Sequence, residues 1–325
     1  MRMYIITGGA GFIGSAMIWK LNSLGIDSIL VVDNLAKTEK WKNLVNRSFD
    51  RYMHRDDFLT AINEGHIKEP VEAIFHLGAC SATTERDADF LMRNNLEYTK
   101  AVCTFARQKR ARFINASSAA TYGDGSQGFD DDVTALQTLR PLNMYGYSKH
   151  LFDLWARRKN ILDEIVCLKY FNVYGPNEQH KDDMRSVVNK SFHQIGEEGL
   201  MRLFKSNVPD YKDGGQMRDF VYIKDCVDIM WWFAQHPEAN GIFNLGTGKA
   251  RSWNDLVNAV FTAMGKKPAI EYVPMPEHLL GKYQNFTQAA MNRLRDAGYT
   301  QDFTSLEDGV KDYVQNYLMQ SDSYL

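Results

Sequence analysis

The stretch TGGAGFIG, residues 7–14, directly follows an apolar run over 3–7 and opens a helical pattern over 12–24. Its glycines satisfy the G-x-G-x-x-G spacing, in which glycine allows a tight turn and brings the amides of a helix start close to a phosphate. A second apolar run over 28–33 ends on Asp33, about 20 residues after the last glycine, where this motif carries an acidic residue. The strand, loop, helix and acidic residue together predict a dinucleotide-binding βαβ unit.

The same alternation continues outward from this unit. Further strands are expected at 73–76, 112–116 and 165–170, and further helices at 57–64, 87–108 and 146–159. Such alternation predicts a parallel sheet with helices on both faces. After residue 172 the pattern loosens: strands are expected at 219–223 and 242–245, and helices at 225–236, 252–264, 287–297 and 305–319.

These segments predict an α/β fold with a Rossmann-type doubly wound parallel sheet and a smaller, discontinuous α/β lobe. We assign residues 1–171 plus 219–247 to the sheet domain and 172–218 plus 248–325 to the lobe that would bind substrate. A length of 325 residues suits about two domains.

Composition excludes several classes of protein. The net charge of −2 gives no positive field for nucleic acid. The four cysteines form no CxxC pair, which speaks against a metal site and a disulfide framework and favours reduced thiols in the cytoplasm. No apolar run reaches 18 residues, so no membrane span is expected, and the run over 3–7 lacks a signal-peptide cleavage site.

A second constellation points to proton transfer. The segment NASSAATYG, residues 115–123, follows a predicted strand, and Tyr145 and Lys149 stand four apart on one helix face. A lysine cation lowers the pKa of a phenol, so we expect Tyr145 to exchange a hydroxyl proton while hydride moves to nicotinamide. Ser118, with Ser117 as the second choice, would orient the reacting carbinol. The Tyr-x-x-x-Lys spacing by itself is unspecific.

The choice between NAD and NADP stays open on the residues alone. Asp33 would accept the ribose hydroxyls of NAD. Lys37, Lys40 and Arg55 follow it in the sequence and could instead hold a 2′-phosphate.

With the glycine loop, Ser117–Gly123 and Tyr145–Lys149, the chain resembles the extended short-chain dehydrogenase/reductase family, specifically its nucleotide-sugar epimerases and dehydratases. Other segments resemble the branch that acts on ADP-linked heptoses. They are HLGACSATTE (76–85), YFNVYGP (170–176), the pair His180–Lys181, RDFVY (218–222), FNLGTG (243–248) and GKYQ (281–284). The resemblance covers essentially the whole chain.

The resemblance implies a tightly bound NADP, with NAD as the alternative. Together with the glycines of the loop, the residues expected to bind it are Gly8, Gly11, Phe12, Ile13, Gly14, Asp33, Asn34, Lys40, Arg55, Leu77, Gly78, Ala79, Cys80, Ser81, Asn94, Lys149 and Val173. The implied reaction inverts C6″ of ADP-D-glycero-D-manno-heptose to the L-glycero epimer through a transient 6″-ketone. Family members form homopentamers, so a homo-oligomer is expected.

The implied catalytic residues are Tyr145, Lys149, Lys181 and Ser118. Lys181 matches the family's second acid/base position, which inversion requires because one fixed base does not reach both orientations of the C6″ oxygen. Without the resemblance, Lys181 would be read as a surface cation. The expected substrate contacts are Ser118, Asn172, Asp183, Lys190, Leu203, Phe204, Lys205, Ser206, Arg218 and Tyr283. Asp182-Asp183 and Lys190 depart from the family's usual Gly-Ser and His.

Three other functions compete with this one. A UDP-hexose 4-epimerase shares the loop, serine, tyrosine and lysine but has no need of Lys181. A 4,6-dehydratase needs an acid beside the serine, where this chain has Ala119-Ala120. A non-catalytic dinucleotide sensor would be expected to lack Tyr145 or Lys149.

Overall fold

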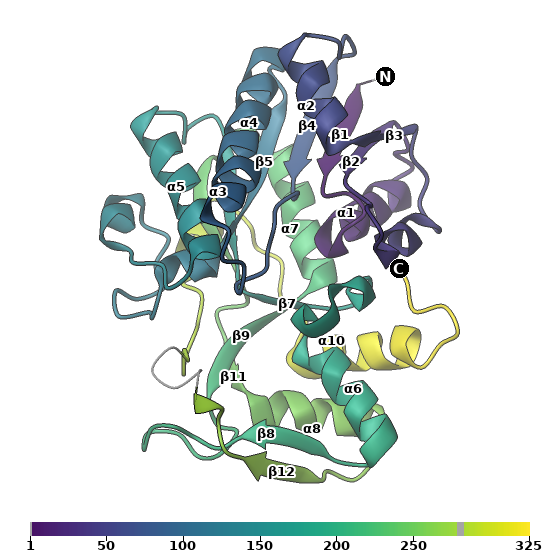
Figure 1. The fold of residues 1–325 in the computed structure, drawn as a ribbon, viewed down its shortest axis with the longest axis vertical. Coiled ribbons are helices and arrows are strands. Elements are labelled where there is room, and N and C mark those ends of the chain that lie inside the picture. Colours follow the sequence, from purple (N-terminus) through teal and green to yellow (C-terminus); the bar gives the residue numbers. More distant parts are fainter. Residues whose placement is uncertain (1, 278–282) are drawn as a thin grey trace.

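The computed structural model describes residues 2–277 and 283–325, and a seven-stranded sheet forms its centre (Figure 1). All neighbouring strands of this sheet pair in parallel. Their spatial order is β10 (Gly241–Leu245), β6 (Val166–Tyr170), β5 (Arg112–Ser118), β4 (Val71–His76), β1 (Met3–Thr7), β2 (Ile29–Asp33) and β3 (Arg51–His54). The order reverses between β1 and β4, and ligands of doubly wound sheets bind where the strand order reverses. The predicted fold class is confirmed.

Helices cover both faces of the sheet (Figure 1). One face packs on α1 (Phe12–Ser23) and α7 (Ile223–Gln235), and the other on α2 (Arg55–Asn63), α4 (Tyr98–Lys109) and α5 (Met144–Arg158). Successive strand side chains point to opposite faces, so Ile6 joins the first core and Ile5 the second. Strands buried on both faces read as continuous apolar runs, which is why the sequence predicts them.

The second half of the chain builds a smaller lobe below the sheet (Figure 1). Its elements are α6 (Val187–Glu198), β8 (Met201–Phe204), α8 (Trp253–Ala263), β12 (Ile270–Val273) and α10 (Leu306–Tyr313), whereas α9 (Asn292–Asp296) packs against β10 of the main sheet. A three-stranded sheet of β7 (Asn172–Tyr174), β9 (Met217–Tyr222) and β11 (Ala250–Ser252) lies between α7 and this lobe. Residues of β1, β9, α8 and α10 share one apolar cluster, so the two parts have a continuous core.

Several elements differ from the sequence-based expectations. Both late strands form, but β10 joins the main sheet while β9 pairs with β7 and β11. The helix expected over 287–297 is shortened to α9, because the amides of Thr287 and Ala289 donate to Met217 and Asp219 instead of to a helical turn. Strand β3, helix α6 and strand β8 were not predicted. The division of the chain into the two parts given above remains a proposal.

The helix expected over 87–108 is continuous but irregular. It consists of α3 (Ala88–Leu91), a π-helical turn over Met92–Glu97 and α4. Such turns admit one extra residue and often occur at functional sites. Among the described residues, no helix has both the length and the apolar character of a membrane span.

Candidate active site

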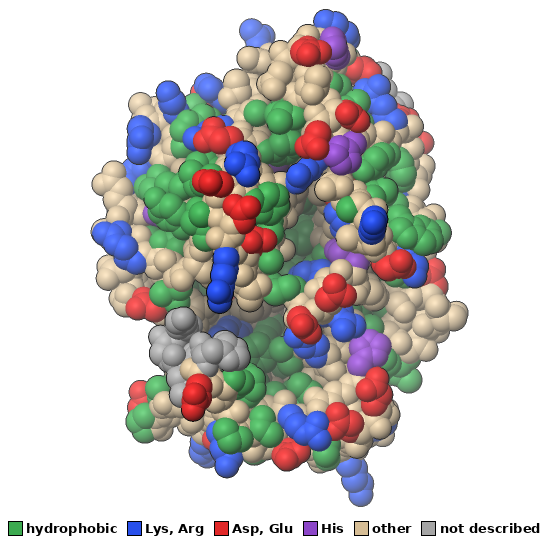
Figure 2. Space-filling view, viewed as in Figure 1, with side chains coloured by type: hydrophobic (Ala, Val, Ile, Leu, Met, Phe, Trp, Pro, Cys, Tyr) green, Lys and Arg blue, Asp and Glu red, His purple; other side chains and the backbone are tan. Residues whose placement is uncertain are grey.

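A cavity of about 950 Å³ opens at the carboxyl ends of β1, β4 and β5. Figure 2 shows this face of the molecule hollowed between the sheet domain and the smaller lobe. The lining includes every residue predicted to bind the cofactor and the four predicted catalytic residues. The structure therefore brings together groups that the sequence spreads over positions 8–181.

The glycine loop leaves no room for side chains where it meets its neighbours. Gly8 has a φ of +68°, and an added Cβ would lie 2.6 Å from the amide nitrogen of Gly78. A Cβ on Gly14 would lie 2.1 Å from the carbonyl oxygen of Gly8. Gly11 caps α1 without any side-chain hydrogen bond, so no capping side chain occupies the first amides of the helix. This cradle fits the pyrophosphate of a dinucleotide.

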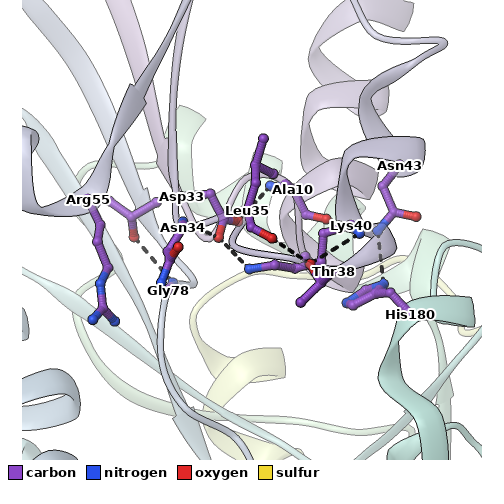
Figure 3. Close-up of polar contacts among 12 residues, drawn as sticks. Ala10, Asp33, Asn34, Leu35, Thr38, Lys40, Asn43, Arg55, Gly78 and His180 are labelled. Atoms are coloured by element: carbon purple, nitrogen blue, oxygen red, sulfur yellow. Dashed lines mark hydrogen bonds and ion pairs between the residues drawn. The ribbon is translucent and has the colours of Figure 1, made fainter.

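Asp33, at the end of β2, lines the cavity next to the glycine loop and makes several hydrogen bonds there (Figure 3). Its Oδ2 accepts from the Ala10 amide at 2.8 Å, and its Oδ1 accepts from the Asn34 amide at 2.6 Å and from Lys40 Nζ at 2.7 Å. In the view of Figure 3, Lys40 and Arg55 lie on opposite sides of Asn34. Both cations line the cavity, which suits the adenosine end of a dinucleotide.

Three predicted catalytic residues converge where β5 ends and α5 begins. Ser118 and Tyr145 both line the cavity, and the Ser118 hydroxyl lies close enough to the Tyr145 phenol to lower the pKa of that phenol. Lys149 Nζ is buried and donates to the carbonyl of Ala116 at 2.7 Å. The Ser117 hydroxyl instead donates to the buried Asp153 carboxylate at 2.9 Å, away from the phenol. This geometry supports the preference for Ser118 over Ser117.

The expected lowering of the Tyr145 pKa is wrong for this structure. Desolvation raises the pKa of Tyr145, and the neighbouring Ser118 hydroxyl offsets that rise in part. Lys149 directs its amine at Ala116, and burial lowers the pKa of Lys149 itself to about 8. The lysine therefore carries less charge near neutral pH than an exposed lysine, and it is not among the groups that shift the pKa of Tyr145.

Asn95, which the sequence analysis missed, ties three of these elements together. It lies in the π-helical turn and is fully buried. Its Oδ1 accepts from the Cys80 amide at 2.9 Å, and its Nδ2 donates to the Cys80 carbonyl at 2.9 Å and to Ser148 Oγ at 3.0 Å. The loop after β4 and the catalytic helix α5 are thereby held to each other. Nothing in the sequence separates Asn95 from its neighbour Asn94.

Lys181 lines the cavity from a short helical turn over Gln179–Met184. Its Nζ lies 5.1 Å from the centre of the Phe12 ring, and desolvation lowers its pKa despite the nearby Glu178 carboxylate. Glu178 is itself fully buried and accepts from the Ser186 hydroxyl at 2.6 Å, which closes the base of this loop. Lys181 is therefore a partly desolvated amine of the cavity and not a freely solvated surface cation.

Arg218 is buried and is absent from the described lining, but it packs against Trp253 of the lining and has no carboxylate partner among the described residues. Its guanidinium carbon is 5.0 Å from the ring centre of Tyr283 and 5.6 Å from that of Trp253. The neighbouring Asp219 accepts instead from the amides of Thr247, Gly248 and Ala289. A buried arginine that is not used in an ion pair suits an anionic ligand.

The other predicted substrate contacts divide into two groups. Ser118 and Asn172 line the cavity. Asp183, Lys190, Leu203, Phe204, Lys205, Ser206 and Tyr283 are absent from the described lining. The Lys190 amine donates to the Asp183 carbonyl, Leu203 packs in the core, and Tyr283 borders a second cavity of about 360 Å³. Gly281 and Lys282 of the GKYQ segment lie outside the described residues.

Further lining residues were not predicted, among them Met184, Phe220 and Trp253. Apolar residues on β9 and α8 have the same sequence pattern as core residues, so no signal distinguishes them. No cluster of three or more His, Cys, Asp or Glu side chains in the described part of the chain could hold a metal ion.

Comparisons with known proteins identify the family of this chain. A sequence model of the NAD dependent epimerase/dehydratase family matches residues 4–246. A protein of Nitratidesulfovibrio vulgaris named ADP-L-glycero-D-manno-heptose-6-epimerase is 64% identical over 323 residues, which is 99% of this chain and 100% of that protein. A protein of the same name from Fusobacterium nucleatum is 50% identical over 332 residues, covering 99% of this chain and 100% of the relative.

Two solved structures illustrate the similarity of fold. The ADP-L-glycero-D-manno-heptose-6-epimerase of Helicobacter pylori superimposes with a TM-score of 0.79 at 27% identity, over 97% of this chain and 96% of its own. The UDP-glucose 4-epimerase of Thermus thermophilus, in complex with NAD, gives 0.73 at 24% identity, over 96% and 97% of the two chains. The family and the glycine cradle together support a nicotinamide dinucleotide as cofactor.

Proposed function

Since the chain belongs to the NAD dependent epimerase/dehydratase family, we propose that it inverts C6″ of ADP-D-glycero-D-manno-heptose to give ADP-L-glycero-D-manno-heptose. The observation that carries this proposal is a second candidate proton-transfer group in the cavity: Lys181 lines the same space as Tyr145. Inversion requires a proton to be handled in two orientations, and the two side chains supply two groups for it. The full-length identity to the heptose epimerases supports the choice of substrate.

Each residue of the site has a distinct role in this reaction. The glycine loop, Asp33 and Lys40 would hold the nicotinamide dinucleotide, which would supply hydride transfer from C6″ and back to the opposite face of the resulting 6″-ketone. Ser118 orients the C6″ oxygen, and either Tyr145 or Lys181 removes its proton. After the ketone has presented its other face, the second of these groups returns a proton to the oxygen. Lys149 fixes the Tyr145 helix to the end of β5 through the Ala116 carbonyl.

We further propose NADP as the natural cofactor, with NAD as the alternative. Lys40 already neutralises Asp33, whose charge would otherwise repel a 2′-phosphate, and Arg55 supplies a second cation in the lining. Mass spectrometry of the nucleotide released on denaturation tests this choice. NADP is the expected mass, and NAD would contradict it.

The second candidate is a UDP-hexose 4-epimerase. It is favoured by the structural likeness to 4-epimerases but gives no role to Lys181. The distinguishing experiment offers the holoenzyme ADP-heptose and UDP-glucose in separate reactions without added reductant. We expect interconversion of the two ADP-heptose epimers; interconversion of UDP-glucose and UDP-galactose alone would favour the second candidate.

Three wider features belong to the same proposal. The enzyme would work in the cytoplasm, in keeping with four cysteines that are all free thiols. It would bind no nucleic acid and no membrane. By family resemblance it would assemble as a homo-oligomer, a pentamer.

A further inference from the structure

Asn43 joins two loops that are far apart in the sequence (Figure 3). It lies in a helical turn over Glu39–Leu44, with 2% of its surface exposed. Its Nδ2 donates to the carbonyl oxygen of Ala10, in the glycine loop, at 2.8 Å. The same nitrogen lies 3.1 Å from Nδ1 of His180, the residue directly before Lys181.

The chemistry of these partners fixes the direction of both hydrogen bonds. A carbonyl oxygen accepts and does not donate, so the amide nitrogen of Asn43 must face Ala10. The second hydrogen of that nitrogen then points at His180 Nδ1, which must accept it. The neutral ring therefore carries its proton on Nε2. The amide group uses both of its donors and has no freedom to rotate without losing them.

The charge state of His180 keeps this link in place. Burial, together with the nearby cations Lys40 and Lys181, lowers the pKa of His180 to about 4, although Asp33 opposes the effect. Nδ1 is therefore an unprotonated acceptor throughout the neutral pH range. The link does not depend on a charge that titrates near physiological pH.

The loop beyond His180 is held in a backbone conformation that it would not adopt alone. Asp182 follows Lys181 with a φ of +46° and a ψ of −123°, in a region that residues other than glycine rarely occupy. Such a conformation persists where surrounding contacts impose it. The Glu178–Ser186 contact closes one side of the loop, and the Asn43–His180 contact fixes the other side to the glycine loop.

We propose that Asn43 is a positioning residue, which holds the loop of Lys181 in register with the glycine loop so that the amine and the bound cofactor meet C6″ together. The inference rests on the proposed function for its kinetic consequence and on the Asn43–His180 contact for its structure. Asn43 touches neither reacting group in this account. It acts through His180 and Lys181.

A double-mutant cycle separates this role from general stabilisation. Asn43→Ala is expected to lower kcat about tenfold or more, because displacements near 1 Å cost up to about a hundredfold in rate. In a Lys181→Met background the same change should have little further effect, whereas in a Tyr145→Phe background it should retain its full effect. Equal losses in both backgrounds would overturn the proposal.

Hydrogen exchange gives a readout that does not need activity. Asn43→Ala in the holoenzyme should speed amide exchange in peptides covering residues 179–185 while leaving the strands of the main sheet unchanged. His180→Phe, which removes the acceptor and keeps a ring, should do the same. Asn46→Ala is the matched control, since Asn46 lies three positions further along, is exposed and contacts Asp322. Unchanged exchange over 179–185 in both test variants would overturn the proposal.

The two experiments also separate the inference from the function on which it rests. A wild-type holoenzyme that leaves ADP-heptose unchanged would refute the proposed function, whatever the exchange data show. If the wild-type enzyme is active, and Asn43→Ala has the same activity and the same amide protection over residues 179–185, the positioning role alone is refuted.

Discussion

At the scale of single residues, the two candidate proton-transfer groups carry the chemistry. Tyr145 lies beside the Ser118 hydroxyl, and Lys181 is partly desolvated in a separate loop. Tyr145→Phe and Lys181→Met should each lower kcat by about a hundredfold or more, in the range expected for loss of one positioned acid or base. Turnover of ADP-heptose measures the effect, and circular dichroism verifies the fold. Wild-type rates in both variants would contradict the use of two groups.

Lys149 gives the reaction a predicted dependence on pH. Burial lowers its pKa to about 8, so its amine is protonated below that pH and neutral above it. Loss of this charge weakens the hydrogen bond to the Ala116 carbonyl by which Lys149 fixes the helix of Tyr145, so kcat/KM should fall as the pH rises through about 8. Arginine stays charged over this range, so Lys149→Arg should remove that alkaline limb, even if its absolute rate is lower.

The exposed Lys68 provides the control for that profile. Lys68→Arg should leave the curve unchanged. If the alkaline limb near pH 8 persists in Lys149→Arg, the limb arises from the titration of another group.

Residues in motifs could be predicted, and residues that act through distant contacts could not. Gly8, Gly11, Gly14, Asp33, Tyr145 and Lys149 belong to motifs of fixed spacing, and all of them line the cavity. Lys181 was found by family resemblance, since a lysine among acidic residues has no signal of its own. Asn43 and Asn95 could not be found, because their partners Ala10, His180 and Cys80 are separated from them in the sequence.

At the scale of elements, His76 links β4 to its neighbours on both sides. The ring is fully buried, with Nδ1 2.7 Å from the Thr7 hydroxyl on β1 and Nε2 2.8 Å from the Thr99 hydroxyl on α4. Burial, helped by the charge of Lys149, lowers the pKa of His76 to about 3 from an ordinary value of 6.5. Between these values the unfolded chain binds the proton and the folded protein does not.

Stability should therefore fall as the pH falls below 6.5. From this group alone, the free energy of unfolding should be about 2 kcal/mol lower near pH 5 than near pH 7. Urea unfolding at the two pH values measures the difference, and His76→Asn should make it smaller by that amount. A pH dependence identical in wild type and variant would show that His76 is not responsible.

The glycine loop and α1 depend on the absence of one side chain. In Gly14→Ala the new Cβ would meet the Gly8 carbonyl oxygen at 2.1 Å, so the loop or the helix must move. We expect loss of bound dinucleotide, measured as the cofactor released per chain on denaturation. Gly196→Ala is the control, because Gly196 lies within α6 and an added Cβ meets nothing within 4 Å. The control should keep its cofactor and gain about 0.5–1 kcal/mol of stability.

Elements of the main sheet were predictable because burial on both faces leaves apolar runs. Edge strand β3, with the sequence RYMH and no buried residue, has no such run. Residues 287–291 read as helix, but their amides are used by β9 and the Phe129 carbonyl, a tertiary contact that local propensity does not contain.

At the scale of the whole molecule, the chain crosses between its two parts more than once, and one of the two apolar clusters extends through both parts. The sheet domain supplies the glycine loop, Asp33 and the Tyr145 helix, while the chain beyond β6 supplies Lys181, Phe220 and Trp253. Sequence periodicity indicated two parts and a returning strand. It did not indicate the three-stranded sheet that joins them, since β7 and β11 are three residues long.

The central claim is that this single cavity oxidises C6″ and reduces it again on the other face. The most direct test supplies the holoenzyme with ADP-D-glycero-D-manno-heptose deuterated at C6″, without added reductant, and follows the product by NMR and mass spectrometry. The account predicts the L-glycero epimer with deuterium retained at C6″. An unchanged substrate, or an epimer that has lost its deuterium to solvent, would contradict it.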